Sequence, residues 1–316
     1  MTSSIPFRPL GKTGVKIPSI GLGCMGMSEC YGEADYVHSL QVLRRSIELG
    51  SYHWDTADLY GIGKNEELLS HILKDHRKDV FLATKFAIVR DENGIAKGVR
   101  GDAPYVRESC EKSLKRLGVD YIDLYYQHRV DPKTPIEETV AAMAELVKEG
   151  KVKYLGLSEC SVDELRRAYK VHPIAALQME YSPWALDIEQ DGILETCREL
   201  CVTIVAYSPL GRGFLSGQIK SLDDLAENDF RRLLPRFQGE NFAKNFEIVR
   251  RLEELGRKKG VTSSQLCLAW ILAQVNGPTT ITLTAEEINE IRSAINAVEV
   301  TGGRYPDSSL IKTILL

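Results

Sequence analysis

The sequence predicts an α/β fold, and a (β/α)8 TIM barrel fits it better than the main alternative, a doubly wound sheet. Two observations carry this prediction. Short apolar runs alternate with longer segments whose apolar residues recur at helical spacing. The alternation continues through most of the 316 residues without a Pro-, Gly- or Ser-rich linker. We therefore expect residues 1–316 to form a single domain around a parallel sheet with right-handed crossovers.

The predicted elements follow one another in a regular order. A small hairpin over residues 7–15, turning at residues 12–14, precedes the first strand. Seven apolar runs are expected to be strands, at residues 20–23, 53–56, 80–84, 122–126, 152–157, 174–179 and 202–207. Helices are expected between or after them at residues 37–49, 65–74, 105–117, 136–148, 162–169 and 193–200.

The bulk composition excludes several classes of protein. A formal net charge of −4 argues against a nucleic-acid footprint, which needs a clustered basic face. The seven cysteines show neither a C-x-x-C pair nor zinc spacing, so reduced thiols and no metal site are expected. Without a signal-peptide core or an apolar run of membrane length, a cytoplasmic protein is expected. The sequence leaves the oligomeric state open.

Titratable side chains follow three consecutive predicted strands. Asp55 and Tyr60 come at and after the second strand, Lys85 after the third and His128 after the fourth. Each has an ordinary structural explanation, such as a capping carboxylate or a lysine with a buried stem. Together they would meet at the carboxyl ends of adjacent strands, where barrel active sites lie. A carboxylate, a phenol, an amine and an imidazole there indicate a proton-transfer site.

Two shorter motifs point elsewhere. Residues 21–26 (GLGCMG) match G-x-G-x-x-G, but a loop-like stretch follows where a dinucleotide-binding fold needs a helix. Glycines that let the backbone approach a ligand, Gly23 among them, explain the pattern better. Residues 60–64 match Y-x-x-x-K, yet two glycines within them disfavour the helix that this motif requires.

Several motifs in the same order resemble the aldo-keto reductase superfamily. They lie at residues 55–61 (DTADLYG), 84–85 (TK), 126–128 (YQH), 156–158 (GLS) and 207–213 (YSPLGRG). Residues 10–14 (LGKTG), 234–237 (LPRF) and 239–242 (GENF) are similar to the branch that includes pyridoxal reductases. The resemblance extends over about residues 7–274. It implies a (β/α)8 barrel that reduces a small-molecule carbonyl to an alcohol with NADPH.

The resemblance also implies roles for the clustered side chains. The family's catalytic tetrad corresponds to Asp55, Tyr60, Lys85 and His128. Tyr60 would be the general acid, and Lys85 would lower the pKa of its phenol from an ordinary value near 10. Asp55 would hold Lys85 in place, and His128 would orient the substrate carbonyl.

Cofactor and substrate contacts are implied in the same way. Ser158 and Gln178 would bind the nicotinamide carboxamide, and Tyr207 would stack on its ring. The pyrophosphate would run along Ser208, Leu210, Arg212 and Gly213. Substrate contacts are expected from three apolar residues of exposed loops, for which simple packing is the alternative: Met25, Tyr31 and Trp184.

The chain departs from the family after residue 274. The family places an eighth strand there, followed by a helix that contacts the 2′-phosphate of NADPH. Residues 275–287 read VNGPTTITLTAEE instead, so about one βα unit is expected to be truncated or missing, with residues 279–283 a candidate substitute strand. No Lys or Arg lies between Trp270 and Arg292, so preference for NADPH over NADH should suffer. A cofactor-binding or regulatory protein with little turnover is the alternative function.

Overall fold

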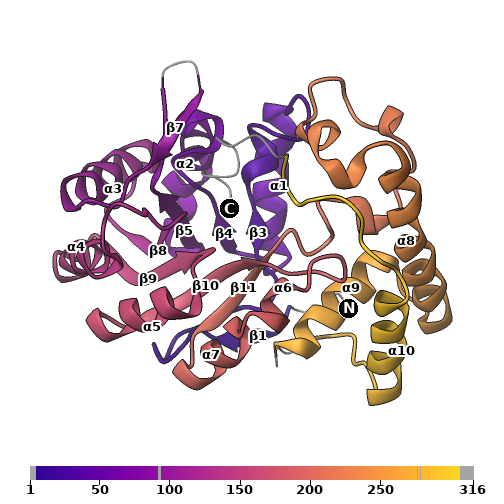
Figure 1. Ribbon diagram of the computed structural model, residues 1–316. Coiled ribbons are helices and arrows are strands. Elements are labelled where there is room, and N and C mark those ends of the chain that lie inside the picture. Colours follow the sequence, from indigo (N-terminus) through magenta and orange to yellow (C-terminus); the bar gives the residue numbers. More distant parts are fainter. Residues whose placement is uncertain (1–4, 92–93, 276, 278, 307–316) are drawn as a thin grey trace.

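The computed structural model describes residues 5–91, 94–275, 277 and 279–306. Its centre is a seven-stranded sheet that curls into a barrel (Figure 1), in which every neighbouring pair is parallel. In spatial order the strands are β3 (Leu22–Gly23), β4 (His53–Asp55), β5 (Phe81–Phe86), β8 (Ile122–Gln127), β9 (Val152–Ser158), β10 (Ile174–Glu180) and β11 (Thr203–Tyr207). The spatial order follows the chain without a reversal, so the barrel prediction is confirmed and the doubly wound alternative is wrong.

The sheet ends at β3 and β11. Within the described residues, β3 pairs only with β4 and β11 only with β10. The expectation that residues 279–283 form a substitute strand is wrong. These residues have no regular secondary structure, and the Thr279 side chain bonds instead to the backbone of Ile281. Strong β propensity is not sufficient where no neighbouring strand supplies hydrogen-bond partners.

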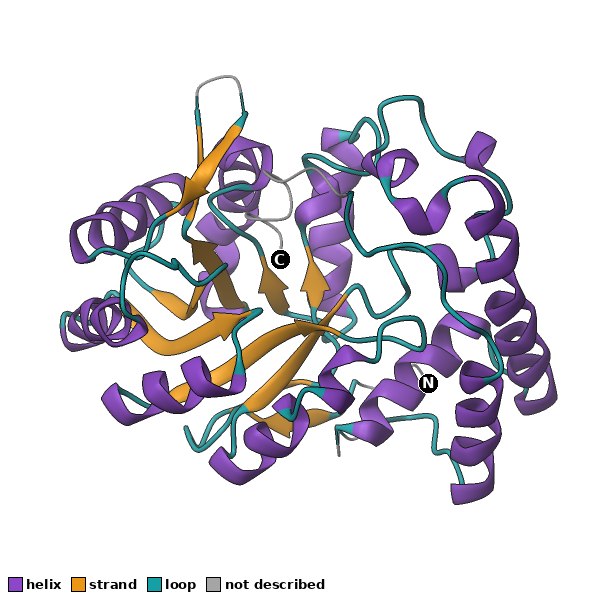
Figure 2. Ribbon diagram, viewed as in Figure 1, coloured by secondary structure: helices purple, strands orange, loops and turns teal. Residues whose placement is uncertain are grey.

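Helices cover the outside of the sheet (Figure 2). The predicted helices are all present with similar bounds, and a short α6 (Asp187–Gln190) is added to them. Ordinary start signals fix these helices, such as the Asp102 side chain that accepts from the backbone N–H of Tyr105. The bounds are α1 (Tyr36–Glu48), α2 (Lys64–His76), α3 (Ala103–Leu117), α4 (Ile136–Lys148), α5 (Val162–Val171) and α7 (Ile193–Leu200).

Three further helices follow β11 and pack together beside the open side of the sheet (Figure 1). They are α8 (Gly239–Lys259), α9 (Ser263–Gln274) and α10 (Ala285–Asn296). Most of α9 is buried, which suits a helix that is apolar on all sides. A capping box between Thr284 and Glu287 starts α10.

Two antiparallel hairpins complete the fold. β1 (Phe7–Pro9) pairs with β2 (Lys16–Pro18), as predicted for the N-terminal hairpin. β6 (Ile88–Arg90) pairs with β7 (Ala96–Val99) directly after β5 and was not predicted. No helix among the described residues is long and apolar enough to cross a membrane.

Candidate active site

Lys85 is the centre of a buried polar cluster at the carboxyl rim of the barrel. Its side chain, fully buried at the end of β5, forms an ion pair with Asp55 at the end of β4. The ammonium also donates to the Tyr60 hydroxyl at 3.2 Å and to the Thr56 carbonyl at 3.0 Å. The Tyr60 ring meets the His128 ring edge to face, with 5.9 Å between centroids. The structure thus brings together all four side chains predicted from the strand ends.

Sheet register explains how residues so far apart in sequence meet. Asp55 lies opposite Ala83 in the β4–β5 pair, and Lys85 lies opposite Tyr126 in the β5–β8 pair, two residues before His128. The backbone N–H of His128 then bonds to the Phe86 carbonyl, continuing the ladder past the strand end. Parallel strands of matched length therefore place these side chains on one rim.

Tyr60 reaches this rim from a 3-10 turn, Tyr60–Gly63, rather than from a strand. Gly61 has φ +58° and Ile62 φ +56°, so the chain turns sharply just after the phenol. A left-handed backbone is costly for a β-branched residue such as Ile62. The turn is stabilised by the backbone N–H of Ile62, which donates to the Leu59 carbonyl at 3.0 Å.

Two buried polar residues at the start of α2 support the cluster and were not singled out from the sequence. Glu66 is fully buried, accepts from Thr84 beside Lys85 at 2.7 Å and pairs with Arg116. Asn65, also fully buried, accepts from Thr56 at 2.6 Å. The available signal was two polar residues on the face of α2 that carries its apolar stripe, which is informative only when burial is known.

Burial sets the direction of the pKa shift of Tyr60. The pKa of Tyr60 lies above its ordinary value because burial raises it more than Lys85 lowers it. The expected direction of the Lys85 effect is therefore right, but the expectation of a net lowering is wrong. Burial alone would lower the pKa of Lys85, and Asp55 and Tyr60 more than offset it, so Lys85 stays charged.

His128 is a neutral imidazole in this environment. Burial, and then the nearby cations Lys85 and Arg129, hold its pKa well below the ordinary value. Its Nδ1 is buried and has no hydrogen-bond partner among the described residues. A neutral imidazole keeps one N–H donor for an oxygen acceptor in the site.

A cavity of about 240 Å³ lies between the two ends of the sheet and opens onto the cluster. Its walls come from the N-terminal hairpin, β3, β11 and α9, and Asp55 is among the residues that line it. Gln178 also lines it and donates to the other Asp55 oxygen at 2.7 Å. Of the predicted cofactor residues, those that line it are Gly23, Gln178, Tyr207 and Ser208.

The other predicted cofactor residues lie around this cavity. Ser158 is buried at the end of β9, in register with Gln178 of β10. Leu210, Arg212 and Gly213 lie in the turn after β11, where Arg212 has φ +57° and Gly213 φ +91°. The described residues contain no group of three metal-ligating side chains.

The three predicted substrate residues have different surroundings. Met25 is half-buried and packs with Tyr60 and its apolar neighbours. Burial raises the pKa of half-exposed Tyr31 to about 12, and Arg231 covers its ring at 4.6 Å. The expectation that Trp184 is exposed is wrong. It is 4% exposed and stacks on Phe214 with 4.3 Å between ring centroids.

A parallel α/β barrel with an ammonium, a carboxylate and a phenol at its carboxyl rim defines a barrel enzyme. A sequence profile of the Aldo/keto reductase family matches residues 19–302, and the chain belongs to that family. It is therefore an NAD(P)H-dependent reductase that acts on carbonyl compounds.

Relatives along nearly the whole chain agree with this assignment. Aldo-keto reductase str7 of Strobilurus tenacellus is 51% identical, covering 95% of each chain. Aldo-keto reductase yakc [NADP(+)] of Schizosaccharomyces pombe is 42% identical, covering 96% of this chain and 95% of its own. The structure is similar to glycerol dehydrogenase AKR11B4 from Gluconobacter oxydans, with a TM-score of 0.83, 26% identity and coverage of 95% and 98%.

Proposed function

We propose that the chain reduces an aldehyde or ketone to the alcohol with NADPH, and that Tyr60 is the general acid. The observation that carries this proposal is the complete burial of Lys85 between Asp55 and Tyr60. A buried ammonium needs a compensating charge, and Asp55 supplies it. The ammonium also donates to the Thr56 carbonyl and to the phenol oxygen of Tyr60.

The four side chains would divide the chemistry among them. The ordinary pKa of a phenol is near 10, and burial raises that of Tyr60 further, so Tyr60 is protonated at neutral pH and has a proton to give to the carbonyl oxygen. The Lys85 ammonium stabilises the phenolate that this transfer leaves. Asp55 holds Lys85, and neutral His128 donates a hydrogen bond that orients the carbonyl. Such acid–base assistance typically contributes about 10²–10⁴ in rate.

The cavity beside the cluster suits a nicotinamide, which supplies the hydride when bound. A Cβ built on Gly23 meets nothing within 4 Å, so the backbone is open to a ligand there. Ser158 and Gln178 would bind the carboxamide, and Tyr207 would pack on the ring. Ser208, Leu210, Arg212 and Gly213 would line the path of the pyrophosphate.

We infer further that the chain lacks the eighth βα unit of its family. The unpaired outer edges of β3 and β11 support this inference. The alignment with the Strobilurus relative spans 327 positions, more than the 316 residues of this chain, so the relative carries residues without a counterpart here. Loss of that unit would remove cations that bind the 2′-phosphate and leave NADPH only weakly preferred over NADH.

The substrate among carbonyl compounds is to be identified by activity assays. The resemblance to the pyridoxal-reductase branch makes pyridoxal a first compound to assay, beside a simple aldehyde and a simple ketone. We propose Met25 and Tyr31 as substrate contacts, because both lie near Tyr60. We leave Trp184 out of this proposal, since its indole is occupied by Phe214.

Two measurements on wild type and Tyr60→Phe test the proposal. One is a titration of NADPH followed by protein fluorescence, and the other is an assay of carbonyl reduction. We expect saturable quenching for both proteins, and a loss of carbonyl reduction of about 10²-fold or more in the variant. Wild-type reduction by Tyr60→Phe would show that another group is the acid. Absence of saturable quenching in the wild type would favour the alternative, a degenerate scaffold with a regulatory role.

A further inference from the structure

The C-terminal part of the described chain returns to the carboxyl rim of the barrel after α10 (Figure 1). We call residues 301–305 the C-terminal strap. Asn245 of α8 anchors its first residue through two backbone bonds, at 2.8 Å to the Thr301 carbonyl and 2.9 Å from its N–H. Gly302 has φ +87°, and a Cβ there would lie 2.7 Å from the Pro235 backbone. The strap therefore follows one closely fitted path, which requires glycine at this position.

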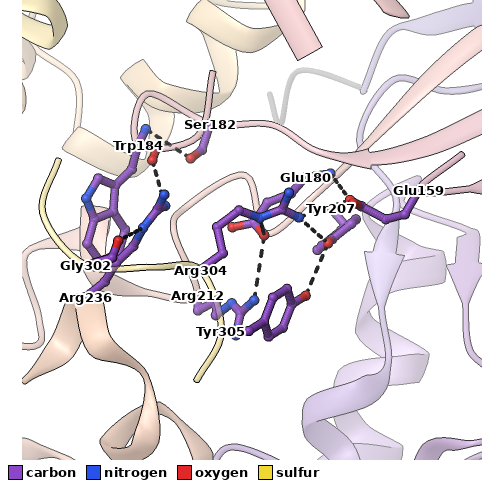
Figure 3. Close-up of polar contacts among 10 residues, drawn as sticks. All are labelled: Glu159, Glu180, Ser182, Trp184, Tyr207, Arg212, Arg236, Gly302, Arg304 and Tyr305. Atoms are coloured by element: carbon purple, nitrogen blue, oxygen red, sulfur yellow. Dashed lines mark hydrogen bonds and ion pairs between the residues drawn. The ribbon is translucent and has the colours of Figure 1, made fainter. Parts of the chain in front are cut away.

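Arg304 of the strap joins three strand ends that are adjacent in the sheet (Figure 3). It donates to Glu180 at the end of β10 at 2.8 Å and to Glu159, just after β9, at 3.1 Å. It also donates to the hydroxyl of Tyr207, the last residue of β11, at 2.9 Å. Its side chain is 15% exposed, so these charge-assisted bonds are largely shielded from water.

Tyr305 contacts the same group of residues from the other side. The Arg212 guanidinium lies over the Tyr305 ring, 4.7 Å from its centroid, and is 3.6 Å from Glu180 (Figure 3). The Tyr305 hydroxyl lies 3.4 Å from that of Tyr207, a long and weak contact. Tyr207 and Arg212 are both predicted cofactor residues, so the strap touches the cofactor site twice.

The strap could either block the cofactor site or shape it, and the residues that line the cavity distinguish these two possibilities. Tyr207 and Ser208 line the cavity that also holds Asp55 and Gln178, whereas no strap residue lines it. Arg304 of the strap thus contacts the hydroxyl of Tyr207, a residue that also lines this cavity. This contact holds the ring in one orientation without filling the cavity.

The charges of the cluster give Arg304 a second effect. Arg304 contacts two carboxylates, Glu159 and Glu180, and Glu180 also lies 3.6 Å from Arg212, where the pyrophosphate of a dinucleotide is predicted to run. Burial would raise the pKa of Glu159, but the cations Arg304 and Arg129 hold that pKa below its ordinary value. Arg304 therefore compensates negative charge that would otherwise repel an anionic ligand.

We propose that Arg304 and Tyr305 are positioning residues of the cofactor site, which hold Tyr207 and Arg212 in the orientation that binds a nicotinamide dinucleotide. This inference rests on the proposed function. Neither residue is proposed to touch the reacting atoms. Their effect should therefore appear first in cofactor affinity.

The test is a fluorescence titration of NADPH with wild type, Arg304→Gln, Arg304→Lys and Tyr305→Phe. Arg292→Gln is the control, because Arg292 forms a bidentate ion pair with Glu189 and its side chain is 26% exposed, against 15% for Arg304. We expect Kd to rise about tenfold in Arg304→Gln, less in Arg304→Lys, and to stay unchanged in the control. The KM for NADPH should rise as Kd does, whereas kcat, which is measured at saturating NADPH, should change less.

A pH series separates positioning from simple packing. Without Arg304 the pKa of Glu159 rises, so NADPH affinity of Arg304→Gln should recover as pH falls and Glu159 is protonated. The affinity of the wild type should not improve in this way. A loss of affinity that is independent of pH and equal to that of Arg292→Gln would overturn the proposal.

The remaining outcomes are also decisive. Unchanged Kd in Arg304→Gln, with cooperative thermal unfolding, would show that the strap only packs. Should that variant not fold, unchanged Kd in both Arg304→Lys and Tyr305→Phe would overturn the proposal equally. Lack of NADPH binding by the wild type would refute the proposed function, and this inference with it.

Discussion

The ammonium of Lys85 is completely buried and lies 3.2 Å from the hydroxyl oxygen of Tyr60. Burial and this cation act on the pKa of Tyr60 in opposite directions, and burial is the larger effect. The phenol is therefore a proton donor at neutral pH, with a cation in place to stabilise its conjugate base.

Removal of Lys85 should change the pH dependence of the reaction. In the proposed mechanism alcohol oxidation requires the Tyr60 phenolate, so its rate should rise with pH. In Lys85→Met the pKa of Tyr60 loses the contribution that lowers it, and the rise should move to higher pH. Carbonyl reduction should fall by about 10²-fold or more. Rate profiles in both directions measure these effects, with exposed Lys112→Met as the control, and an unmoved profile would contradict the assigned role of Lys85.

Glu66 should matter for stability more than its place in a helix suggests. Glu66→Gln keeps the size of the side chain but leaves Arg116 without its partner. Because Arg116 is 23% exposed, loss of its charged partner should cost about 1–3 kcal/mol. Urea unfolding measures this cost. Glu108→Gln, in an exposed pair with Lys112, should show no measurable change, and equal effects in the two variants would show that burial of Glu66 is unimportant.

Two glycines of the barrel sheet, Gly156 in β9 and Gly23 in β3, should respond to substitution in different ways. A Cβ on Gly156 would lie 2.4 Å from the buried Tyr126 ring, so Gly156→Ala should lose about 1–3 kcal/mol of unfolding free energy. Gly23→Ala has space for its methyl group and should keep its stability but bind NADPH more weakly. Urea unfolding and the NADPH titration measure the two effects. Full NADPH affinity in Gly23→Ala would place the cofactor away from β3.

Discrimination between the two nicotinamide cofactors should be weak. No Lys or Arg lies between Trp270 and Arg292, so the segment that carries the 2′-phosphate contacts in the family offers no cation here. We expect the Kd values of NADH and NADPH to agree within about tenfold, the effect of one ionic contact. The comparison should be made at two salt concentrations. A preference above about 100-fold that falls with added salt would reveal a phosphate site elsewhere in the chain.

Local sequence patterns were sufficient to predict the order of the barrel strands, most of the helices between them and the four polar residues of the rim. Hydrophobic periodicity is local, and α4 and α7 begin and end at the predicted residues because nearby apolar positions and charges fix them. The ends of strands can be recognised from the same local patterns. The sequence alone therefore predicted that Asp55, Lys85 and His128 lie on one rim.

The long-range contacts that support the site could be recognised only in the tertiary structure. Three features depend on segments far apart in the chain. They are the burial of Glu66 against Arg116, the lack of a strand at residues 279–283, and the hydrogen bond from Arg304 to Tyr207. Burial also set the sign of the Tyr60 pKa shift, because desolvation depends on every neighbour of the phenol. Desolvation and contacts between distant segments produce no periodic pattern in the sequence. The position of one arginine after the last helix therefore predicts little until the fold places two carboxylates and a phenol around it.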